Sequence, residues 1–400
     1  MKEEFQFVEY QRRDGETFDL SFLSLEKAKA VRRFHASFPV YVRTPLAELK
    51  NTARAMGLGA VYVKDESFRF GLNAFKVLGG SYAMGHYLAD RLGVPISECD
   101  YDLLTSDETK KKLGDITFVT ATDGNHGRGV AWTAGRLRQK SVVYMPKGSA
   151  GERLANIQAE GAEASITDLN YDEAVRFACS QAEKHGWVMV QDTAWEGYER
   201  IPKWIMQGYM TMAYEAYEQL PEKPTHIFLQ AGVGSMAGAA AGFFSAVYGE
   251  KRPKIVVVEP NKADCIFRTA KAADGRLHFV TGEMNTIMAG LACGEPCSIG
   301  WNVLRDYADG FISCPDYAAA QGMRALGNPE KGDPAVVSGE SGAAAFGCVA
   351  EIMRDGRLLE LREKLGLDES SRVLFISTEG DTDRQNYRSI VWDGAYPRRL

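Results

Sequence analysis

Residues 60–76 of this 400-residue chain read AVYVKDESFRFGLNAFK. The first five residues have the apolar and β-branched content of a buried strand, and a helix is expected to begin near Leu78. Lys76 therefore stands between a strand and a helix, with the apolar residues Phe75 and Val77 beside it. A lysine in apolar surroundings can lose its charge and form a Schiff base. Lys76 is accordingly a candidate catalytic residue, against the alternative of an ordinary solvated lysine.

Short apolar runs alternate with helical patterns along the rest of the chain. We expect strands at residues 116–121, 141–145, 188–190, 226–229, 255–258 and 373–376. We expect helices at residues 129–137, 152–160, 172–185, 237–248 and 342–354. This alternation is typical of an α/β fold with mostly parallel, twisted sheets flanked by helices.

The composition excludes several classes of protein. The net charge of −6, without a dense basic block, makes nucleic acid an unexpected partner. The first residues, MKEEF, lack the apolar core of a signal peptide, and no apolar run approaches the roughly 18 residues of a membrane helix. We therefore predict a cytoplasmic protein with no membrane partner.

The number of cysteines also favours a cytoplasmic protein. An odd number of cysteines, seven, argues against a secreted disulfide framework. Reduced thiols are expected, although a pairing of Cys265 with Cys293 or Cys297 stays open. The spacing of Cys293 and Cys297 lacks the second pair of a zinc site, and no histidine spacing is that of a metal site, so no metal is predicted.

A turn rich in asparagine and glycine follows the strand expected at residues 116–121. It reads TATDGNHG at residues 120–127 and leads into a helix. Backbone N–H groups at such a turn can bind an anion such as a substrate carboxylate. The alternative is an ordinary turn in which Asp123 and Asn125 cap the helix. The candidate substrate-binding residues are Thr122, Asp123, Gly124, Asn125 and His126.

A glycine-rich turn, QAGVGSMAG at residues 230–238, follows the strand expected at residues 226–229. Its backbone amides and the Ser235 hydroxyl can hold one phosphate, although a tight turn alone also favours glycine. The spacing G-x-G-x-x-x-G is not the dinucleotide pattern, which disfavours a Rossmann dehydrogenase. The candidate phosphate ligands are Gly232, Val233, Gly234, Ser235 and Met236.

A lysine, an asparagine turn and a glycine-rich loop, in this order, look like the parts of a pyridoxal 5'-phosphate site. Asn125 could then bond the ring oxygen of the cofactor, and Ser377 or Thr378, after the last expected strand, could face its ring nitrogen. Asp192 also follows a strand, and α/β sheets bind ligands at the carboxyl ends of their strands. The alternative for Ser377 and Thr378 is a helix cap or a loop hydroxyl, and the alternative for Asp192 is a solvated or capping side chain.

These segments together resemble the tryptophan-synthase-β family of pyridoxal-phosphate-dependent enzymes, which is fold type II. Residues 44–46, TPL, are similar to an early motif of that family, and residues 340–343, ESGA, to a late motif of its serine and threonine dehydratases. The resemblance runs from about residue 40 to residue 385. It implies that Lys76 is the Schiff-base lysine. It also implies two interleaved domains, for which we predict a large cofactor-binding domain of residues 1–82 and 200–400 and a small substrate-binding domain of residues 83–199.

Within this family, the subfamily that the chain resembles is that of the diaminopropionate ammonia-lyases, to judge by residues 73–76, 121–129, 191–198 and 231–238. The resemblance implies a homodimer that converts D- or L-2,3-diaminopropionate to pyruvate and two ammonia. Three alternatives stay open: a serine or threonine dehydratase, a dehydrogenase, and a non-catalytic binding protein.

The resemblance also implies roles for the acidic residues. Dehydratases of the family carry serine at the position of Asp123, and their substrates have a neutral hydroxyl where diaminopropionate has an ammonium. A charge-assisted hydrogen bond from that ammonium to Asp123 or Asp192 would contribute roughly 1.5–3 kcal/mol. We predict that Lys76 removes the α-proton on one face, and that Asp123, assisted by Asp192, removes it on the other.

Overall fold

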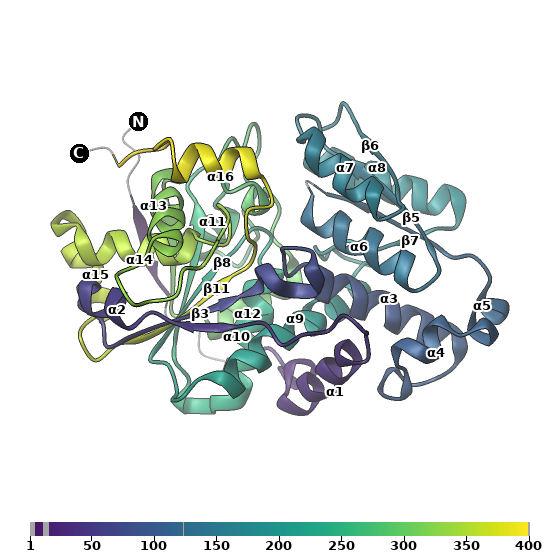
Figure 1. Ribbon diagram of the computed structural model, residues 1–400, viewed down its shortest axis with the longest axis horizontal. Helices are drawn as coiled ribbons and strands as arrows, with labels where there is room; N and C mark the ends of the chain where they lie inside the picture. The colour runs from purple at the N-terminus through teal and green to yellow at the C-terminus, as the bar shows by residue number, and fades with distance from the viewer. Residues whose placement is uncertain (1–4, 11–15, 123, 399–400) are drawn as a thin grey trace.

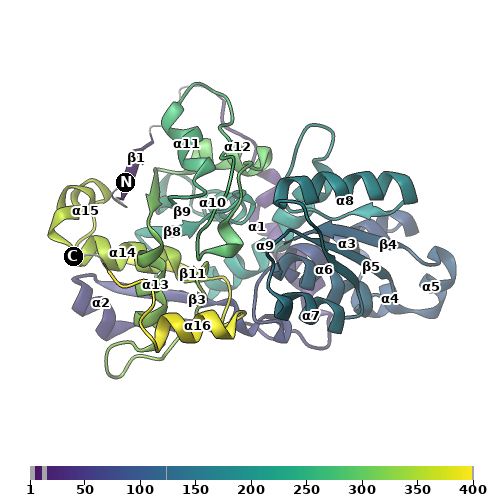
Figure 2. The same cartoon turned by 90° about the horizontal axis from the view of Figure 1, so that it is seen from above.

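The computed structural model describes residues 5–10, 16–122 and 124–398, and these residues form two sheets that lie side by side, each covered by helices (Figures 1 and 2). The larger sheet has seven strands within the described ranges, in the order β1 (Gln6–Glu9), β10 (Gly310–Cys314), β9 (Lys254–Pro260), β8 (His226–Gln230), β11 (Arg372–Ser377), β3 (Ala60–Asp65) and β2 (Leu46–Glu48). The edge strands β1 and β2 pair antiparallel, and the other neighbours pair parallel.

The smaller sheet is parallel throughout. Its strands lie in the order β6 (Glu163–Ile166), β5 (Lys140–Met145), β4 (Thr117–Ala121) and β7 (Val188–Met189). All four come from one continuous stretch of the chain, whereas the strands of the larger sheet come from before and after that stretch.

The central strands of the larger sheet are apolar on both faces because helices cover both sides. Successive strand residues point to opposite faces. Ile255 and Val257 of β9 accordingly belong to one hydrophobic cluster, and Val256 and Val258 to another. The first cluster is covered by α1 (Leu25–Ala36), α9 (Arg200–Gln219), α10 (Ser235–Tyr248), α11 (Cys265–Ala272) and α12 (Ser298–Tyr307). The second is covered by α2 (Lys50–Met56), α13 (Asp316–Gly327), α14 (Ala344–Arg354), α15 (Leu359–Leu365) and α16 (Arg384–Val391).

Helices also cover both faces of the smaller sheet. Helix α8 (Tyr171–His185) packs on one face, and α6 (Asn125–Arg136) and α7 (Gly151–Ala159) pack on the other. The short helices α4 (Tyr101–Thr105) and α5 (Asp107–Leu113) lie beside α3 (Val77–Leu92) (Figure 1).

Helix α3 (Val77–Leu92) joins the two halves, since it packs against α6 on one side and α9 on the other. Glycine makes both contacts close. A Cβ atom on Gly129 of α6 would lie 2.9 Å from the Val77 backbone, and one on Gly208 of α9 would lie 2.3 Å from the Leu78 carbonyl oxygen. The helix that begins directly after Lys76 is therefore held on two sides.

The α/β fold with mostly parallel sheets is confirmed. Each of the six later strands expected from the sequence is present, within one or two residues at its ends. The division into domains of residues 1–82 with 200–400 and residues 83–199 remains a proposal, and α3 runs across its first boundary.

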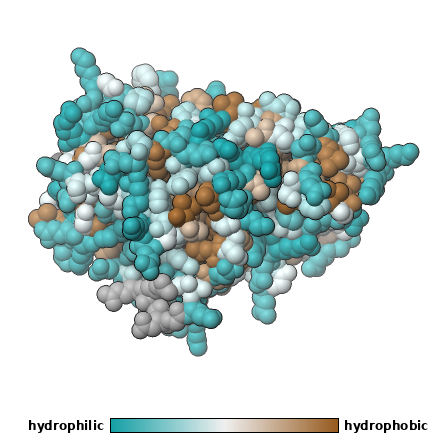
Figure 3. Space-filling view, turned by 90° about the horizontal axis from the view of Figure 1, so that it is seen from below, coloured by the Kyte–Doolittle hydropathy of each residue, from teal (hydrophilic) through white to brown (hydrophobic). Residues whose placement is uncertain are grey.

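Hydrophilic residues cover most of the face shown in Figure 3, and the hydrophobic residues on it gather in a few separate areas. Among the helices that the structure describes, none combines the length and apolar character needed to cross a membrane. All seven cysteines lie in the described ranges and carry thiols rather than disulfides.

Candidate active site

A cavity of about 740 Å³ opens between the two sheets, at the carboxyl ends of their strands. Its walls come from both halves of the molecule: Thr122 and Asn125 follow β4, residues 231–237 follow β8, and Thr378 follows β11. This volume lies within the range of roughly 300–1,000 Å³ that is usual for small-ligand sites. The carboxyl edge is also where parallel α/β sheets bind ligands.

Lys76 lies at this cavity because the segment before it is tied to the end of β11. Strands β3 and β11 are parallel neighbours, and the two segments that follow them leave the sheet side by side. Ala74 forms a bridge with Glu379, and the Phe75 N–H donates to the Thr378 carbonyl oxygen at 3.0 Å. These backbone contacts place Lys76 at the start of α3, with its side chain in the cavity wall.

The Lys76 amine forms a hydrogen-bonded ion pair with the buried Asp192 carboxylate. Burial opposes the charge of each partner, but their mutual attraction prevails in both. It raises the pKa of Lys76 and lowers the pKa of Asp192 to about 2. The structure therefore brings two predicted catalytic residues, 116 positions apart in the chain, into contact at one wall of the cavity.

The asparagine turn joins β4 to α6, and two of its amides are already engaged. The Thr122 N–H donates to the Tyr144 carbonyl oxygen, and the Gly124 N–H donates to the Thr122 hydroxyl, each at 3.0 Å. Asn125 is the first residue of α6, where backbone N–H groups lack an acceptor within the helix. Asp123 lies outside the described residues, so its predicted role stays a prediction.

His126 is buried on α6 and lines the cavity. Its Nε2 atom donates to the Val190 carbonyl oxygen at 2.8 Å, because a carbonyl can only accept. This bond links α6 to the segment that carries Asp192.

The glycine-rich turn lies at the N-terminus of α10, and Gly232, Val233, Gly234, Ser235 and Met236 all line the cavity. Gly234 has φ +92°, a conformation that other residues rarely adopt. A Cβ atom on Gly232 would lie 3.2 Å from Cys293 Sγ and from the Gly290 carbonyl oxygen. The loop thus presents bare backbone to the cavity at a helix N-terminus, which suits a phosphate. The Ser235 hydroxyl itself donates to the Asp192 carbonyl oxygen at 2.5 Å.

Substitution of Gly234 by alanine is expected to weaken the affinity for pyridoxal phosphate about tenfold. The positive φ costs a non-glycine residue roughly 1–2 kcal/mol, which the loop would relieve by leaving its binding conformation. The matched control is Gly249→Ala, which has φ +56° at the other end of α10. Titration of cofactor-depleted protein measures both. Equal affinities in the two variants would mean that the loop does not hold the phosphate.

The two candidate hydroxyls at the end of β11 differ in position. Thr378 lines the cavity, and its hydroxyl accepts from the Gln230 side chain at 3.1 Å. Ser377 is turned toward Ser338, to whose hydroxyl it donates at 2.8 Å. Of the two hydroxyl residues, Thr378 is therefore the one that lines the cavity.

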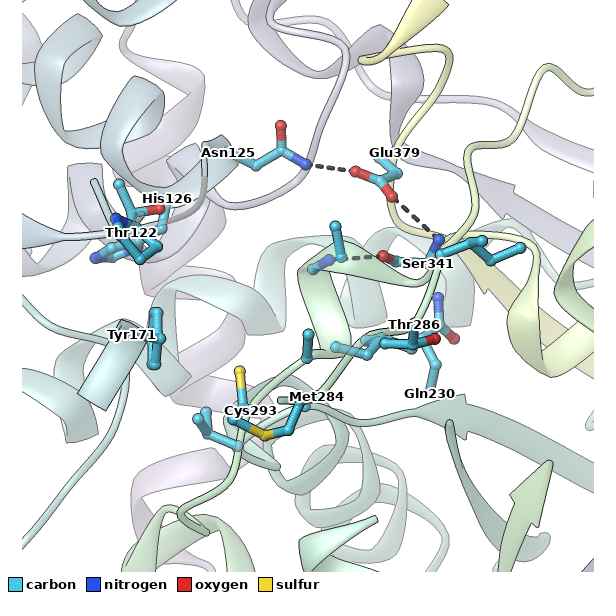
Figure 4. Close-up of a pocket in the computed structure, with 18 of the residues that line it drawn as sticks. Thr122, Asn125, His126, Tyr171, Gln230, Met284, Thr286, Cys293, Ser341 and Glu379 are labelled. Atoms are coloured by element: carbon cyan, nitrogen blue, oxygen red, sulfur yellow. Dashed lines mark hydrogen bonds between the residues drawn. The ribbon is translucent and has the colours of Figure 1, made fainter. Parts of the chain in front are cut away.

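Glu379 is a cavity residue that the sequence did not single out, although it directly follows Thr378. Its carboxylate accepts from the Asn125 side-chain amide and, at 3.1 Å, from the Ser341 N–H (Figure 4). The Ser341 hydroxyl in turn accepts from the Gly290 N–H at 3.0 Å. Burial and the neighbouring Glu379 raise the pKa of Glu340 to about 7. Glu379 thus connects Asn125, which follows a strand of the smaller sheet, to the loop that carries Ser341 in the half with the larger sheet.

These residues fit pyridoxal phosphate, since one cavity combines a lysine amine, a glycine-lined helix N-terminus and a side-chain hydroxyl. The family profile described as "Pyridoxal-phosphate dependent enzyme" matches residues 38–379. The chain belongs to this family of pyridoxal-phosphate-dependent enzymes, and the resemblance seen in the sequence is confirmed. The dehydrogenase alternative is thereby set aside.

The chain is similar in sequence to several proteins of known name. The chain is 52% identical over 395 residues to the diaminopropionate ammonia-lyase of Salmonella typhimurium, covering 98% of each chain. It is 50% identical over 387 residues to that of Escherichia coli K12, covering 96% of this chain and 95% of the relative. The crystal structure of the holo Escherichia coli enzyme matches with a TM-score of 0.92 and 47% identity, over 99% of this chain and 98% of the other.

Proposed function

We propose that this protein is a pyridoxal-phosphate-dependent ammonia-lyase that converts 2,3-diaminopropionate to pyruvate and two ammonia. The observation that carries this proposal is the buried, ionised Asp192 beside the Lys76 amine in a cavity of cofactor size. The close sequence relation to diaminopropionate ammonia-lyases over nearly the whole chain supports the same activity.

The diamine is favoured over serine because of charge. Asp192 is 3% exposed, and attraction to the Lys76 ammonium lowers its pKa to about 2, so the carboxylate is ionised while the two residues are paired. When Lys76 is linked to the cofactor, the second ammonium of a diamine takes the place of that cation beside Asp192. A charge-assisted hydrogen bond contributes roughly 1.5–3 kcal/mol, which corresponds to a preference of about tenfold or more.

The proposed reaction assigns a separate role to the cofactor and to each residue of the site. The cofactor supplies an electron sink next to the α-carbon when it is bound. The start of α6, at Asn125, receives the substrate carboxylate. The Lys76 amine removes the α-proton of the isomer that presents it on the lysine side. Asp123, assisted by Asp192, removes it on the opposite side, and we propose on this basis that both D- and L-diaminopropionate react.

The proposed reaction is tested by incubating purified protein and pyridoxal phosphate with D-diaminopropionate, L-diaminopropionate or serine, and measuring pyruvate. We expect pyruvate from both isomers of the diamine and at least about tenfold less from serine, from the charge argument above. Comparable rates with serine would favour a serine or threonine dehydratase. Absence of pyruvate in all three reactions would contradict both activities.

Replacement of Asp123 by asparagine is expected to reduce turnover of the D isomer more than that of the L isomer. An amide cannot accept the α-proton, and loss of a general base typically costs about 10²–10⁴-fold in rate. Steady-state kinetics with each isomer measures the two losses. Asp168→Asn, an exposed aspartate of the same half, serves as the control and should leave both rates unchanged. Equal losses on both isomers would mean that Asp123 binds substrate without selecting a face.

The proposal also includes the oligomeric state, the cellular location and the domain division predicted from the sequence. The enzyme is proposed to work as a homodimer in the cytoplasm, and to consist of the two interleaved domains defined above. The substrate would enter between these domains, because the cavity has walls from both.

A further inference from the structure

Tyr209 is a buried tyrosine that reaches the cavity wall from α9. Only 1% of its surface is exposed. Within the residues that the structure describes, its hydroxyl has no hydrogen-bond partner. Because an unsatisfied buried hydroxyl is costly, such a group in a cavity wall indicates a partner that enters the cavity or moves within it.

The ring of Tyr209 packs against the residues on both sides of Lys76. Its centroid lies 4.8 Å from that of Phe75, which precedes the lysine. On the other side, a Cβ atom on Gly79 would lie 2.7 Å from Cε1 of the tyrosine ring, so the bare glycine of α3 makes room for it. The tyrosine therefore supports the turn from which the lysine side chain extends.

The phenol is neutral at the pH of catalysis. Burial raises the pKa of Tyr209, with Lys76 opposing the rise and Asp192 adding to it. A neutral phenol oxygen accepts a hydrogen bond without adding negative charge. Asp192 acts differently, because its carboxylate favours the ammonium form of Lys76, which cannot take up a proton.

We propose that Tyr209 is a positioning residue for the Lys76 amine. The phenol oxygen accepts one N–H of the neutral amine, and the lone pair of the nitrogen is thereby directed at the substrate α-carbon. The Asp192 contact would hold the lysine before the cofactor is linked to it, and the tyrosine contact would hold the free amine during proton removal. This inference rests on the proposed function, since it assigns the tyrosine to the isomer that Lys76 deprotonates.

The test compares wild-type holoenzyme with Tyr209→Phe, which removes one oxygen and keeps the ring packing. We expect kcat for the isomer that reacts through Lys76 to fall about tenfold, with KM changing less. The other isomer should lose less. Tyr214→Phe is the matched control, because that tyrosine lies on the same helix but interacts with Glu218 and Arg32 rather than with the cavity.

A second readout does not depend on turnover. The visible absorbance of the bound cofactor changes with pH as its link to Lys76 gains or loses a proton. A phenol oxygen that accepts this N–H stabilises the protonated form, so Tyr209→Phe should move the midpoint down by roughly 0.5–1 pH unit. Tyr214→Phe should leave the midpoint in place.

Two results for Tyr209→Phe would overturn the inference, both with an unchanged pH midpoint of the cofactor absorbance. In the first, kcat is unchanged for both isomers. In the second, kcat falls equally for both isomers. If the wild-type enzyme fails to convert diaminopropionate, the proposed function falls, and the absorbance midpoint alone still decides whether Tyr209 contacts the lysine nitrogen. If Tyr209→Phe does not fold, Tyr209→Met, which also lacks the hydroxyl, takes its place in both measurements.

Discussion

Replacement of Lys76 by alanine is expected to abolish both the yellow absorbance of the bound cofactor and the formation of pyruvate. The Lys76 amine lies in the cavity wall, where it can link to the aldehyde and then act as a base, and general-base catalysis alone contributes about 10²–10⁴-fold. The variant should also leave Asp192 as a buried carboxylate without its cation, which raises its pKa. Absorbance spectra and pyruvate assays measure the two losses.

A second lysine of the same cavity provides the control for this experiment. Lys262 lines the cavity but pairs with Asp316 at 2.6 Å, and Lys262→Ala is expected to keep the yellow absorbance. If Lys76→Ala kept both the absorbance and the activity, Lys76 would have no covalent role. If both variants lost the absorbance, the loss would reflect damage to the cavity as a whole.

Replacement of Glu215 by alanine is expected to lower the free energy of unfolding by about 3–5 kcal/mol, the usual cost of leaving buried charges without their partner. The Glu215 carboxylate, on α9, lies 2.7 Å from the Lys64 amine of β3 and 2.8 Å from the Arg69 guanidinium. All three side chains are fully buried. Arg69 also pairs with Glu66 at 2.8 Å, so removal of one carboxylate leaves a net positive charge inside the protein.

Glu218 on the same helix is the matched control. It pairs with Arg32 and Arg43, and all three side chains are partly exposed. Glu218→Ala should cost less than about 1 kcal/mol, because exposed ion pairs contribute little. Denaturant unfolding curves give both values. Similar losses for the two variants would mean that burial does not set the strength of the Glu215 pairs.

The parallel strands were predictable because burial on both faces leaves a local signature. The strand at residues 373–376 is a continuous apolar run between polar residues, and the structure places it inside the larger sheet, between β8 and β3. Strand β10 was missed. Its sequence, GFISC, carries a glycine and a serine, so its strand character comes from pairing with β9 and β1. The antiparallel edge strands β1 and β2 were also missed, because they are only four and three residues long and too short to show a clear alternating pattern.

The site was predictable where a residue lies in a turn directly after a strand. Lys76 lies further from its strand, beyond the 3-10 helix at Glu66–Gly71, and was recognised by the apolar residues beside it. Asn125, the glycine loop and Thr378 do follow the strand pattern, and all line the cavity. Tyr209 does not follow it, because it lies in the interior of a long helix whose buried face is rich in large side chains. The choice of Thr378 over Ser377 depends on the neighbouring Ser338, whose position no local pattern reveals.

The backbone contacts of residues 74 and 75 with residues 378 and 379 link an early part of the chain to a very late one. During synthesis, the segment that carries Lys76 emerges long before β11 exists to hold it. Nascent chains that end before Arg372 would lack this anchor. Pyridoxal phosphate is therefore expected to bind only after β11 and the residues that follow it have been synthesised. Truncated products would stay colourless when pyridoxal phosphate is added.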